Sequence, residues 1–199
     1  GYIGLPTAAL LANRGYSVHG VDVVASTVDI INQGKIHIVE PDLDTFVRAA
    51  VNSGNLKASL TPDIADVFII AVPTPFHEGY VPNVDYVISA TKAIAPFVKE
   101  GDIVILESTS PVGTTDLVGD TLKEQGVDTS KLFIAHCPER VLPGHIMREL
   151  VENDRIVGGL TAEATKKTVE FYKTFVSGAV LSTDARTAEM AKLTENSFR

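Results

Sequence analysis

Three short apolar runs, each followed at once by a polar loop that contains proline, constrain the fold of this chain more than any other feature. They are VFIIAV at 67–72, DIVIL at 102–106 and LFIAH at 132–136. Continuous apolar runs of this length are typical of strands that are buried on both faces of a sheet. Amphipathic stretches separate the runs, and such alternation predicts a parallel sheet with helices on both faces.

The remaining elements follow from the same alternation. SVHGVD at 17–22 is predicted to be a strand, and weaker strand candidates lie at 155–157 and 179–181. Helices are expected at 5–14, 26–33, 43–53, 84–98, 114–125, 162–175 and from 186 to the end. In an open sheet of this type, ligands bind beyond the carboxyl ends of the strands. We therefore expect the chemistry in the loops PTP, ESTSPVGTT and CPER, which follow the three apolar runs.

Composition limits the classes of partner. The chain has 199 residues, 45% hydrophobic and 21% charged, so it can bury a core. Its net charge of −8 argues against a nucleic-acid partner, because such proteins usually carry a basic surface. No run of about 18 apolar residues occurs, so no membrane span is expected. Cys137 is the single cysteine, which excludes a disulfide within the chain and favours a cytoplasmic location.

The five histidines are scattered along the chain, and their spacing bears on whether a metal ion is bound. No pair of them has a metal-ligand spacing such as H-E-x-x-H. Carboxylates do not gather around them in the sequence. We therefore expect no metal.

The first residues fit the end of a dinucleotide-binding loop. GYIG at 1–4 matches the last four positions of G-x-G-x-x-G, and an apolar helix is predicted to follow. In that motif the helix N-terminus faces a pyrophosphate. Asp22 lies 21 residues after Gly1, which is the spacing of a carboxylate that binds the adenosine ribose. An acid at that position favours NAD over NADP, because it would repel the 2′-phosphate. The expected cofactor-binding residues here are Gly1, Tyr2, Ile3, Gly4 and Asp22.

Two threonines in the polar loops are further candidates for the cofactor site. Thr74 and Thr115 carry hydroxyl groups at the same predicted edge of the sheet. We interpret both as NAD contacts. Helix capping is the alternative role for such hydroxyls, and spacing alone leaves it open.

Six segments occur in the order found in one enzyme family. They are GYIGLP at 1–6, HIVEPDL at 37–43, AVPTPF at 71–76, ESTSPVGTT at 107–115, CPERVLPG at 137–144 and TAEMAKLTENSFR at 187–199. Together they resemble the nucleotide-sugar 6-dehydrogenases, the family of UDP-glucose dehydrogenase, through nearly all of the chain. HIVEPDL, CPERVLPG and KLTENSFR look most like the bacterial branch that acts on UDP-N-acetyl-D-mannosamine.

The resemblance implies a domain organisation. Residues 1–183 would form an N-terminal NAD-binding Rossmann domain, and residues 184–199 would begin a long central helix that helps to form a homodimer. A C-terminal UDP-binding domain would lie beyond this chain. The first strand of the Rossmann sheet would be missing upstream of Gly1, and its absence would leave two sheet edges unpaired.

The resemblance also implies a reaction. The C6 hydroxyl of UDP-N-acetyl-D-mannosamine would be oxidised by NAD in a four-electron reaction to UDP-N-acetyl-D-mannosaminuronate, for surface polysaccharide. UDP-N-acetylglucosamine and UDP-glucose remain open as substrates. A non-catalytic NAD-binding module is the alternative for the chain alone, which is expected to be inactive by itself.

Roles for the last segment come from the same resemblance. Lys192 would accept the hydroxyl proton or stabilise the developing alkoxide, Asn196 would bind the sugar or a water, and Arg199 would contact the substrate. Their spacing of i, i+4 and i+7 puts them on one helical face. The alternative is a solvated polar face on which Glu195 pairs locally.

The loops after the strands supply the other candidates. By resemblance, Glu139 would handle the water that hydrolyses a thioester and Thr109 would lie near that water, although a capping hydroxyl is the alternative for Thr109. Arg140 and Val141 would contact the substrate. Relatives that oxidise UDP-glucose usually carry a second acid four residues after Glu139, where this chain has Pro143, which argues against glucose.

The second oxidation needs a covalent adduct, which a cysteine thiolate can form. In the family that cysteine lies beyond the central helix, outside this chain. Cys137 is expected to be a buried thiol at the end of a strand, as is usual for free cysteine.

Overall fold

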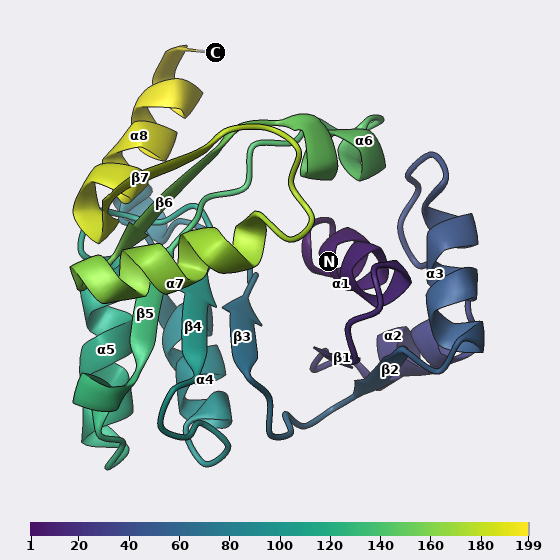
Figure 1. The fold of residues 1–199 in the computed structure, drawn as a ribbon, viewed down its shortest axis with the longest axis horizontal. Helices are drawn as coiled ribbons and strands as arrows, with labels where there is room; N and C mark the ends of the chain where they lie inside the picture. Colours follow the sequence, from purple (N-terminus) through teal and green to yellow (C-terminus); the bar gives the residue numbers. More distant parts are fainter. Residues whose placement is uncertain (199) are drawn as a thin grey trace. The chain divides into compact units, whose positions relative to one another are not determined.

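The structure is a computed structural model that describes residues 1–198, and the chain forms two compact α/β units (Figure 1). Unit 1 comprises Gly1–Asp63 and Val141–Asn153, and unit 2 comprises Ile64–Arg140 and the chain from Asp154 onward. Parallel strands dominate the sheets of both units, which confirms the expected fold class. Among the helices of residues 1–198, none has the length and apolar character needed to cross a membrane.

Unit 1 is a two-stranded parallel sheet with four helices. Its strands are β1 (Val18–Val21) and β2 (Leu56–Ser59). Its helices are α1 (Gly4–Asn13), α2 (Ala25–Asn32), α3 (Leu43–Asn52) and α6 (Ile146–Glu152). α1 packs against α3. It also contacts α6, which lies more than 130 residues later in the sequence. Fully buried side chains such as Leu43 and Val47 form the core, because the apolar face of α3 turns inward.

Unit 2 contains a five-stranded sheet in the order β3-β4-β5-β6-β7. The strands are β3 (Val67–Ile70), β4 (Ile103–Leu106), β5 (Phe133–His136), β6 (Arg155–Gly159) and β7 (Val180–Asp184). The helices are α4 (Asp85–Ile94), α5 (Thr114–Glu124), α7 (Ala162–Tyr172) and α8 (Ala185–Phe198), with short 3-10 turns at Glu78–Tyr80 and Thr129–Lys131. α7 covers one face of the sheet, and α4 and α5 cover the other (Figure 1).

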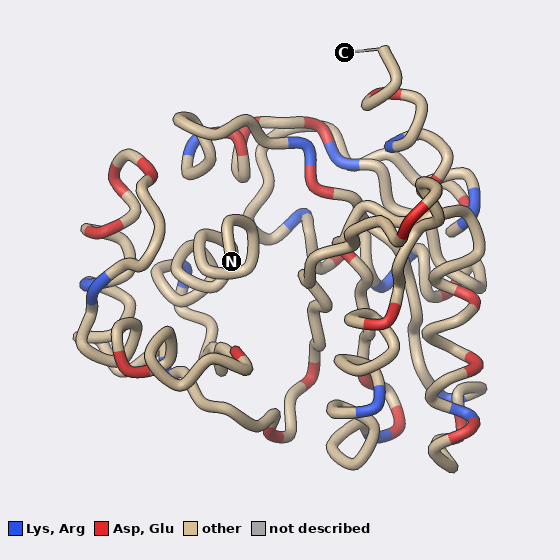
Figure 2. The backbone as a smooth tube through the Cα atoms, turned by 180° about the vertical axis from the view of Figure 1, so that it is seen from behind, with Lys and Arg blue, Asp and Glu red and all other residues tan. Residues whose placement is uncertain are grey.

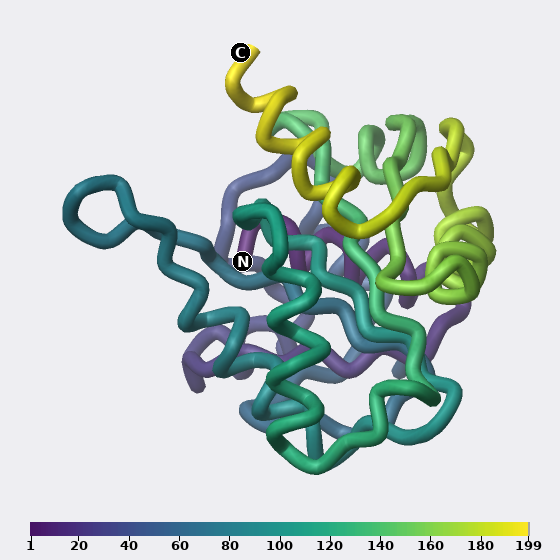
Figure 3. Tube along the Cα trace, turned by 90° about the vertical axis from the view of Figure 1, so that its left-hand side faces the viewer, coloured from purple at the N-terminus to yellow at the C-terminus, as the bar shows by residue number. Residues whose placement is uncertain are grey.

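The core of unit 2 explains why the apolar runs form strands. Val104 and Leu106 of β4 pack with Val87 of α4 and Leu122 of α5. The loop between β3 and α4 projects from this sheet (Figure 3). Along the helices, Lys and Arg lie interspersed with Asp and Glu (Figure 2).

β6 corrects the expectation of a wholly parallel sheet. It runs antiparallel to β5, with Ala135 opposite Gly159 and His136 opposite Gly158. A parallel return requires a crossover connection, usually a helix on the face of the sheet. The one helix between β5 and β6 is α6, and it belongs to unit 1. The chain therefore returns to this sheet in the antiparallel direction.

Within residues 1–198, one outer strand of each sheet has a single partner. Among the described residues β1 pairs with β2 alone, and β3 pairs with β4 alone. The weaker strand candidates at 155–157 and 179–181 are confirmed as β6 and β7. β2 and α6 are elements that the sequence pattern did not predict.

Candidate functional site

The start of α1 in unit 1 presents backbone amides that no side chain caps. Ile3 is the N-cap residue, its side chain makes no capping hydrogen bond, and the first turn carries no acid. The amide of Leu5 donates to the carbonyl of Gly1 at 3.3 Å. A helix N-terminus whose amides no side chain caps is suited to a phosphate.

Asp22 follows β1 in the same unit, and its carboxylate is held by the backbone. Oδ1 of Asp22 accepts a hydrogen bond from the amide of Val24 at 3.0 Å. The carboxylate of Asp22 lies near enough to the backbone nitrogen of Gly1 to act on it electrostatically, so the two ends of the predicted motif lie close together. Backbone amides at a helix start and a carboxylate after a strand are groups of the kind that bind the pyrophosphate and ribose of a dinucleotide.

The segment from 141 to 146 in unit 1 is ordered by two carboxylates. Glu40 is buried and accepts hydrogen bonds from the amides of Gly144 at 2.9 Å and Ile146 at 2.8 Å. Glu149 accepts a hydrogen bond from the amide of Leu142 at 2.7 Å. Val141, a predicted substrate contact, begins this segment and is half-buried.

In unit 2, hydroxyl groups tie together the loops that follow β3 and β4. Oγ of Ser108 accepts a hydrogen bond from the amide of Val72 at 2.9 Å. The hydroxyl of Thr74 donates to the carbonyl of Thr109 at 2.5 Å. Thr109 itself is half-buried.

Glu189 of α8 caps the N-terminus of α5, and sequence reasoning missed it. Its Oε1 accepts hydrogen bonds from the amide of Thr115 at 2.7 Å and from the hydroxyl of Thr115 at 2.6 Å. Its Oε2 accepts from the amide of Gly113 at 2.7 Å. The Thr115 hydroxyl, a predicted NAD contact, is thus already engaged in a capping contact. The carboxylate has no exposed surface, so α8 is fixed to the loop that carries Thr109.

Glu195 links two of the predicted site residues. Nζ of Lys192 lies 3.3 Å from Oε2 of Glu195, and the Arg140 guanidinium lies 3.1 Å from Oε1. Burial acts to raise the pKa of Glu195, but the hydrogen bond from Arg140 and the charge of Lys192 lower it overall. The pair of Lys192 and Glu195 is the local pairing that the alternative interpretation expected, although Lys192 is buried rather than solvated.

Asn196 and Arg199 are the other two residues of the expected helical face. Asn196 is exposed on α8, one turn after Lys192. Arg199 lies outside the described residues. The roles of Lys192, Asn196 and Arg199 stay predictions.

Glu139 belongs to a buried cluster that the sequence did not reveal. Nη1 of Arg155 donates a hydrogen bond to Oε2 of Glu139 at 2.7 Å. The hydroxyl of Tyr172 donates to Oε1 of Glu107 at 2.6 Å. The Arg155 guanidinium also lies 5.6 Å from the centre of the Tyr172 ring. Apart from the Pro-Glu motif, no spacing in the sequence signals that these four side chains meet.

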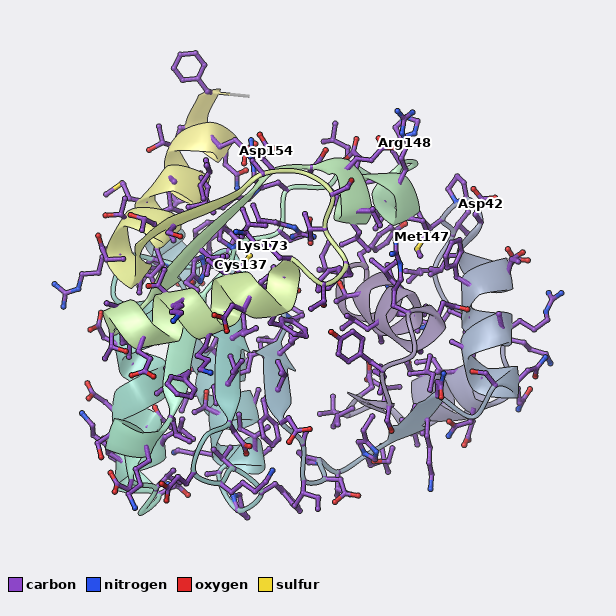
Figure 4. All side chains as sticks on the ribbon, viewed as in Figure 1. Asp42, Cys137, Met147, Arg148, Asp154 and Lys173 are labelled. Atoms are coloured by element: carbon purple, nitrogen blue, oxygen red, sulfur yellow. The ribbon has the colours of Figure 1, made fainter. Side chains whose placement is uncertain are left out.

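Cys137 lies inside unit 2 and is fully buried (Figure 4). Burial raises the pKa of its thiol to about 12, so the reactive thiolate is not formed near neutral pH. This confirms the expectation of a buried thiol. Within residues 1–198, no group of three or more metal-binding side chains is placed to hold a metal ion.

Comparison with known proteins gives these observations a family context. A sequence model of the UDP-glucose/GDP-mannose dehydrogenase family, NAD binding domain, matches residues 1–176. The UDP-N-acetyl-D-mannosamine dehydrogenase of Campylobacter jejuni is 57% identical, over 100% of this chain and 51% of that protein. The NDP-N-acetyl-D-galactosaminuronic acid dehydrogenase of Ralstonia nicotianae is 56% identical, over 100% of this chain and 49% of that protein.

Solved structures agree with these sequence matches. The native structure of a UDP-N-acetyl-mannosamine dehydrogenase from Staphylococcus aureus matches with a TM-score of 0.95 at 44% identity. That match covers 100% of this chain and 49% of the solved chain. The chain spans about half the length of the relatives that it matches.

Proposed function

Because the chain belongs to the UDP-glucose/GDP-mannose dehydrogenase family, as part of its NAD-binding domain, we propose that the whole protein is an NAD-dependent nucleotide-sugar 6-dehydrogenase. Its proposed substrate is UDP-N-acetyl-D-mannosamine, which would be oxidised at C6 to the uronate for surface polysaccharide. The observation that carries the cofactor part is the uncapped start of α1 close to the Asp22 carboxylate. The identities of 57% and 52% to dehydrogenases named for that sugar support the substrate.

A second sugar is a specific rival. The relative named for N-acetyl-D-galactosaminuronic acid is 56% identical, almost the same as the mannosamine enzyme from Campylobacter. Both sugars carry an N-acetyl group, so an N-acetylhexosamine is common to the two candidates. UDP-N-acetylglucosamine and UDP-glucose complete the set of sugars to be compared.

NAD, when bound, accepts hydride from C6 of the sugar. We assign Gly1–Gly4 and Asp22 to its phosphates and ribose, and Thr74 and Thr115 as further contacts. The N–H groups of α1 would hold the phosphates without a positively charged side chain, because the helix end itself carries partial positive charge. The ribose diol would donate hydrogen bonds to the Asp22 carboxylate.

Lys192 is the proposed group for the hydroxyl proton or the developing alkoxide. It is buried, and its ammonium lies 3.3 Å from Glu195, which also pairs with Arg140. To react, the substrate hydroxyl would have to come within hydrogen-bond distance of the Lys192 ammonium. The positive charge of Lys192 would then stabilise the negative charge that develops on the hydroxyl oxygen. Asn196, Arg140, Val141 and Arg199 are the proposed substrate contacts.

Glu139 and Thr109 are the proposed groups for water in the later hydrolytic step. Glu139 can accept a proton from water, because Arg155 and the amide of Arg140 hold it as a carboxylate. The thiolate that this step needs is proposed to lie outside the chain, since Cys137 is buried and protonated near neutral pH.

The remaining parts of the proposal concern organisation. Residues 1–183 would form the NAD-binding domain and residues 184–199 the start of the central helix, with a homodimer formed through that helix. In support, β7 ends at Asp184 and α8 begins at Ala185. We propose a cytoplasmic enzyme whose partner is the UDP-sugar.

A panel of sugars tests the function. The full-length protein is mixed with NAD and each of the three UDP-sugars named above, together with UDP-N-acetyl-D-galactosamine, and NADH formation is followed. We expect the highest kcat/KM with UDP-N-acetyl-D-mannosamine. Preference for the galactosamine sugar would favour the second candidate, and turnover of UDP-glucose alone would contradict both.

A further inference from the structure

Two buried carboxyl groups and one buried guanidinium belong to the same cluster in unit 2. Glu107 follows β4, Glu139 follows β5 and Arg155 begins β6, and their exposed fractions are 2%, 8% and 1%. If all three were charged, a net negative charge would remain inside the unit, which is unfavourable because a buried charge needs a partner. One proton is therefore expected to stay on the two carboxyl groups near neutral pH.

The hydrogen bonds indicate which carboxyl group carries that proton. Oε2 of Glu139 accepts from Arg155 at 2.7 Å, and Oε1 accepts from the amide of Arg140 at 2.6 Å. Glu107 accepts one hydrogen bond, from the Tyr172 hydroxyl, and its Oε2 has no partner within residues 1–198. Donors stabilise an ionised carboxylate, whereas an oxygen that meets no donor is suited to carry a proton itself.

We propose that Glu107 keeps its proton until the pH reaches neutrality and is a positioning residue for Glu139, and that its ionisation adds a second negative charge beside this proton acceptor. The effect on turnover rests on the proposed function, whereas the protonation of Glu107 does not. With Glu107 neutral, Arg155 and Glu139 form a pair with no net charge. With Glu107 ionised, the added charge attracts the proton of a bound water more strongly toward Glu139, so hydrolysis is faster.

Among the side chains of this cluster whose pKa is shifted, Glu107 is the one with a pKa near neutrality. Burial, followed by the charge of Glu139, raises the pKa of Glu107 to about 7, against the opposing effects of Arg155 and Tyr172. Burial also raises the pKa of Cys137 to about 12 and that of Tyr172 well above its ordinary value. Burial lowers the pKa of His136 to about 4. Burial acts to lower the pKa of Arg155, but the charges of Glu139 and its neighbours outweigh it, so the guanidinium stays charged.

Carbon-13 NMR of the full-length protein, labelled at the glutamate carboxyl carbons, tests the protonation directly. We expect one carboxyl signal that titrates near pH 7 and disappears in Glu107→Gln. In Tyr172→Phe the midpoint should move to higher pH, because the hydrogen bond that stabilises the anion is lost. The proposal is overturned if no glutamate titrates between about pH 6 and 8, or if that signal survives in Glu107→Gln.

The link to the reaction is tested by the pH dependence of kcat with the UDP-sugar that the protein turns over. The ratio of wild-type kcat to that of Glu107→Gln should rise about threefold or more through neutral pH, and Tyr172→Phe should move the rise to higher pH. Glu170→Gln is the matched control, because Glu170 is exposed on α7, and its profile should equal that of the wild type. A ratio that is constant across pH overturns the link. If no sugar is turned over, the proposed function fails while the NMR result still decides the protonation.

Discussion

Nη1 of Arg155 donates a hydrogen bond to Oε2 of Glu139 at 2.7 Å, and both side chains are buried. The antiparallel register explains this contact, because a ladder that pairs His136 with Gly158 brings position 155 opposite position 139 when it is continued. If β6 ran parallel to β5, its first residue, Arg155, would lie near the start of β5, away from Glu139. The antiparallel direction of β6 therefore places the Arg155 guanidinium beside the Glu139 carboxylate.

Removing that cation should destabilise unit 2. Arg155→Met leaves the Glu139 carboxylate buried without its partner, and breaking a buried ion pair costs about 3–5 kcal/mol. Urea unfolding of the full-length protein measures the change. The double variant Arg155→Met with Glu139→Gln is the control, and it should regain part of the loss because no unpaired charge remains. A double variant as unstable as the single one would show that packing, not charge, is responsible.

Glu189 should contribute to stability through its cap on α5. Glu189→Ala leaves the amides of Gly113 and Thr115 without an acceptor in a buried place, and we expect a loss of about 2 kcal/mol. The free energy of unfolding in urea gives the value. Glu170→Ala on the exposed face of α7 is the comparison, for which a change below about 0.5 kcal/mol is expected. Equal effects of the two substitutions would argue against the cap.

His136 should make the protein sensitive to acid. Burial lowers its pKa to about 4 from an ordinary value of 6.5. Between these two values the unfolded chain binds the proton and the folded chain does not, so stability is lost as pH falls from about 6.5 to 4 and is intact above that range. The loss is roughly 3 kcal/mol when complete.

The urea midpoint at pH 7 and at pH 5 measures this effect. The drop between the two pH values should be smaller in His136→Leu than in the wild type. Glu107 works in the opposite direction, because its raised pKa makes stability fall as pH rises toward 7. For that reason the comparison is made between variants rather than on the wild-type curve. An unchanged drop in His136→Leu would contradict the assignment.

Asp22 should control the choice of cofactor. Asp22→Asn replaces the carboxylate proposed for the ribose diol, and the loss of a hydrogen bond to a charged group should raise the KM for NAD by about tenfold or more. The KM for NADP should rise less or fall, since the repulsion of its 2′-phosphate is removed. Asp29→Asn, on the exposed surface of α2, is the matched control. Equal shifts with both cofactors would rule out contact with the ribose.

Much of the fold could be predicted because its strands are continuous apolar runs and its helices have regular amphipathic periods. The direction of β6 could not, because it depends on where α6 packs, and α6 has only seven residues. The same limit applies to the site. Glu139 could be proposed because its Pro-Glu motif resembles that of the family. Arg155, Glu189 and Glu40, in contrast, act on partners 16, 74 to 76 and 104 to 106 residues away. Such contacts form only when the chain folds, so no local spacing in the sequence predicts them.

The central claim is that the whole protein oxidises the C6 alcohol of a UDP-sugar to the acid with NAD, and the stoichiometry of the reaction tests it most directly. A limiting amount of UDP-N-acetyl-D-mannosamine is consumed to completion by the full-length protein with excess NAD, and NADH is counted by absorbance. We predict about two NADH per sugar, because each hydride transfer removes two electrons. One NADH per sugar would contradict the four-electron reaction, and no NADH with any UDP-sugar would contradict the function itself.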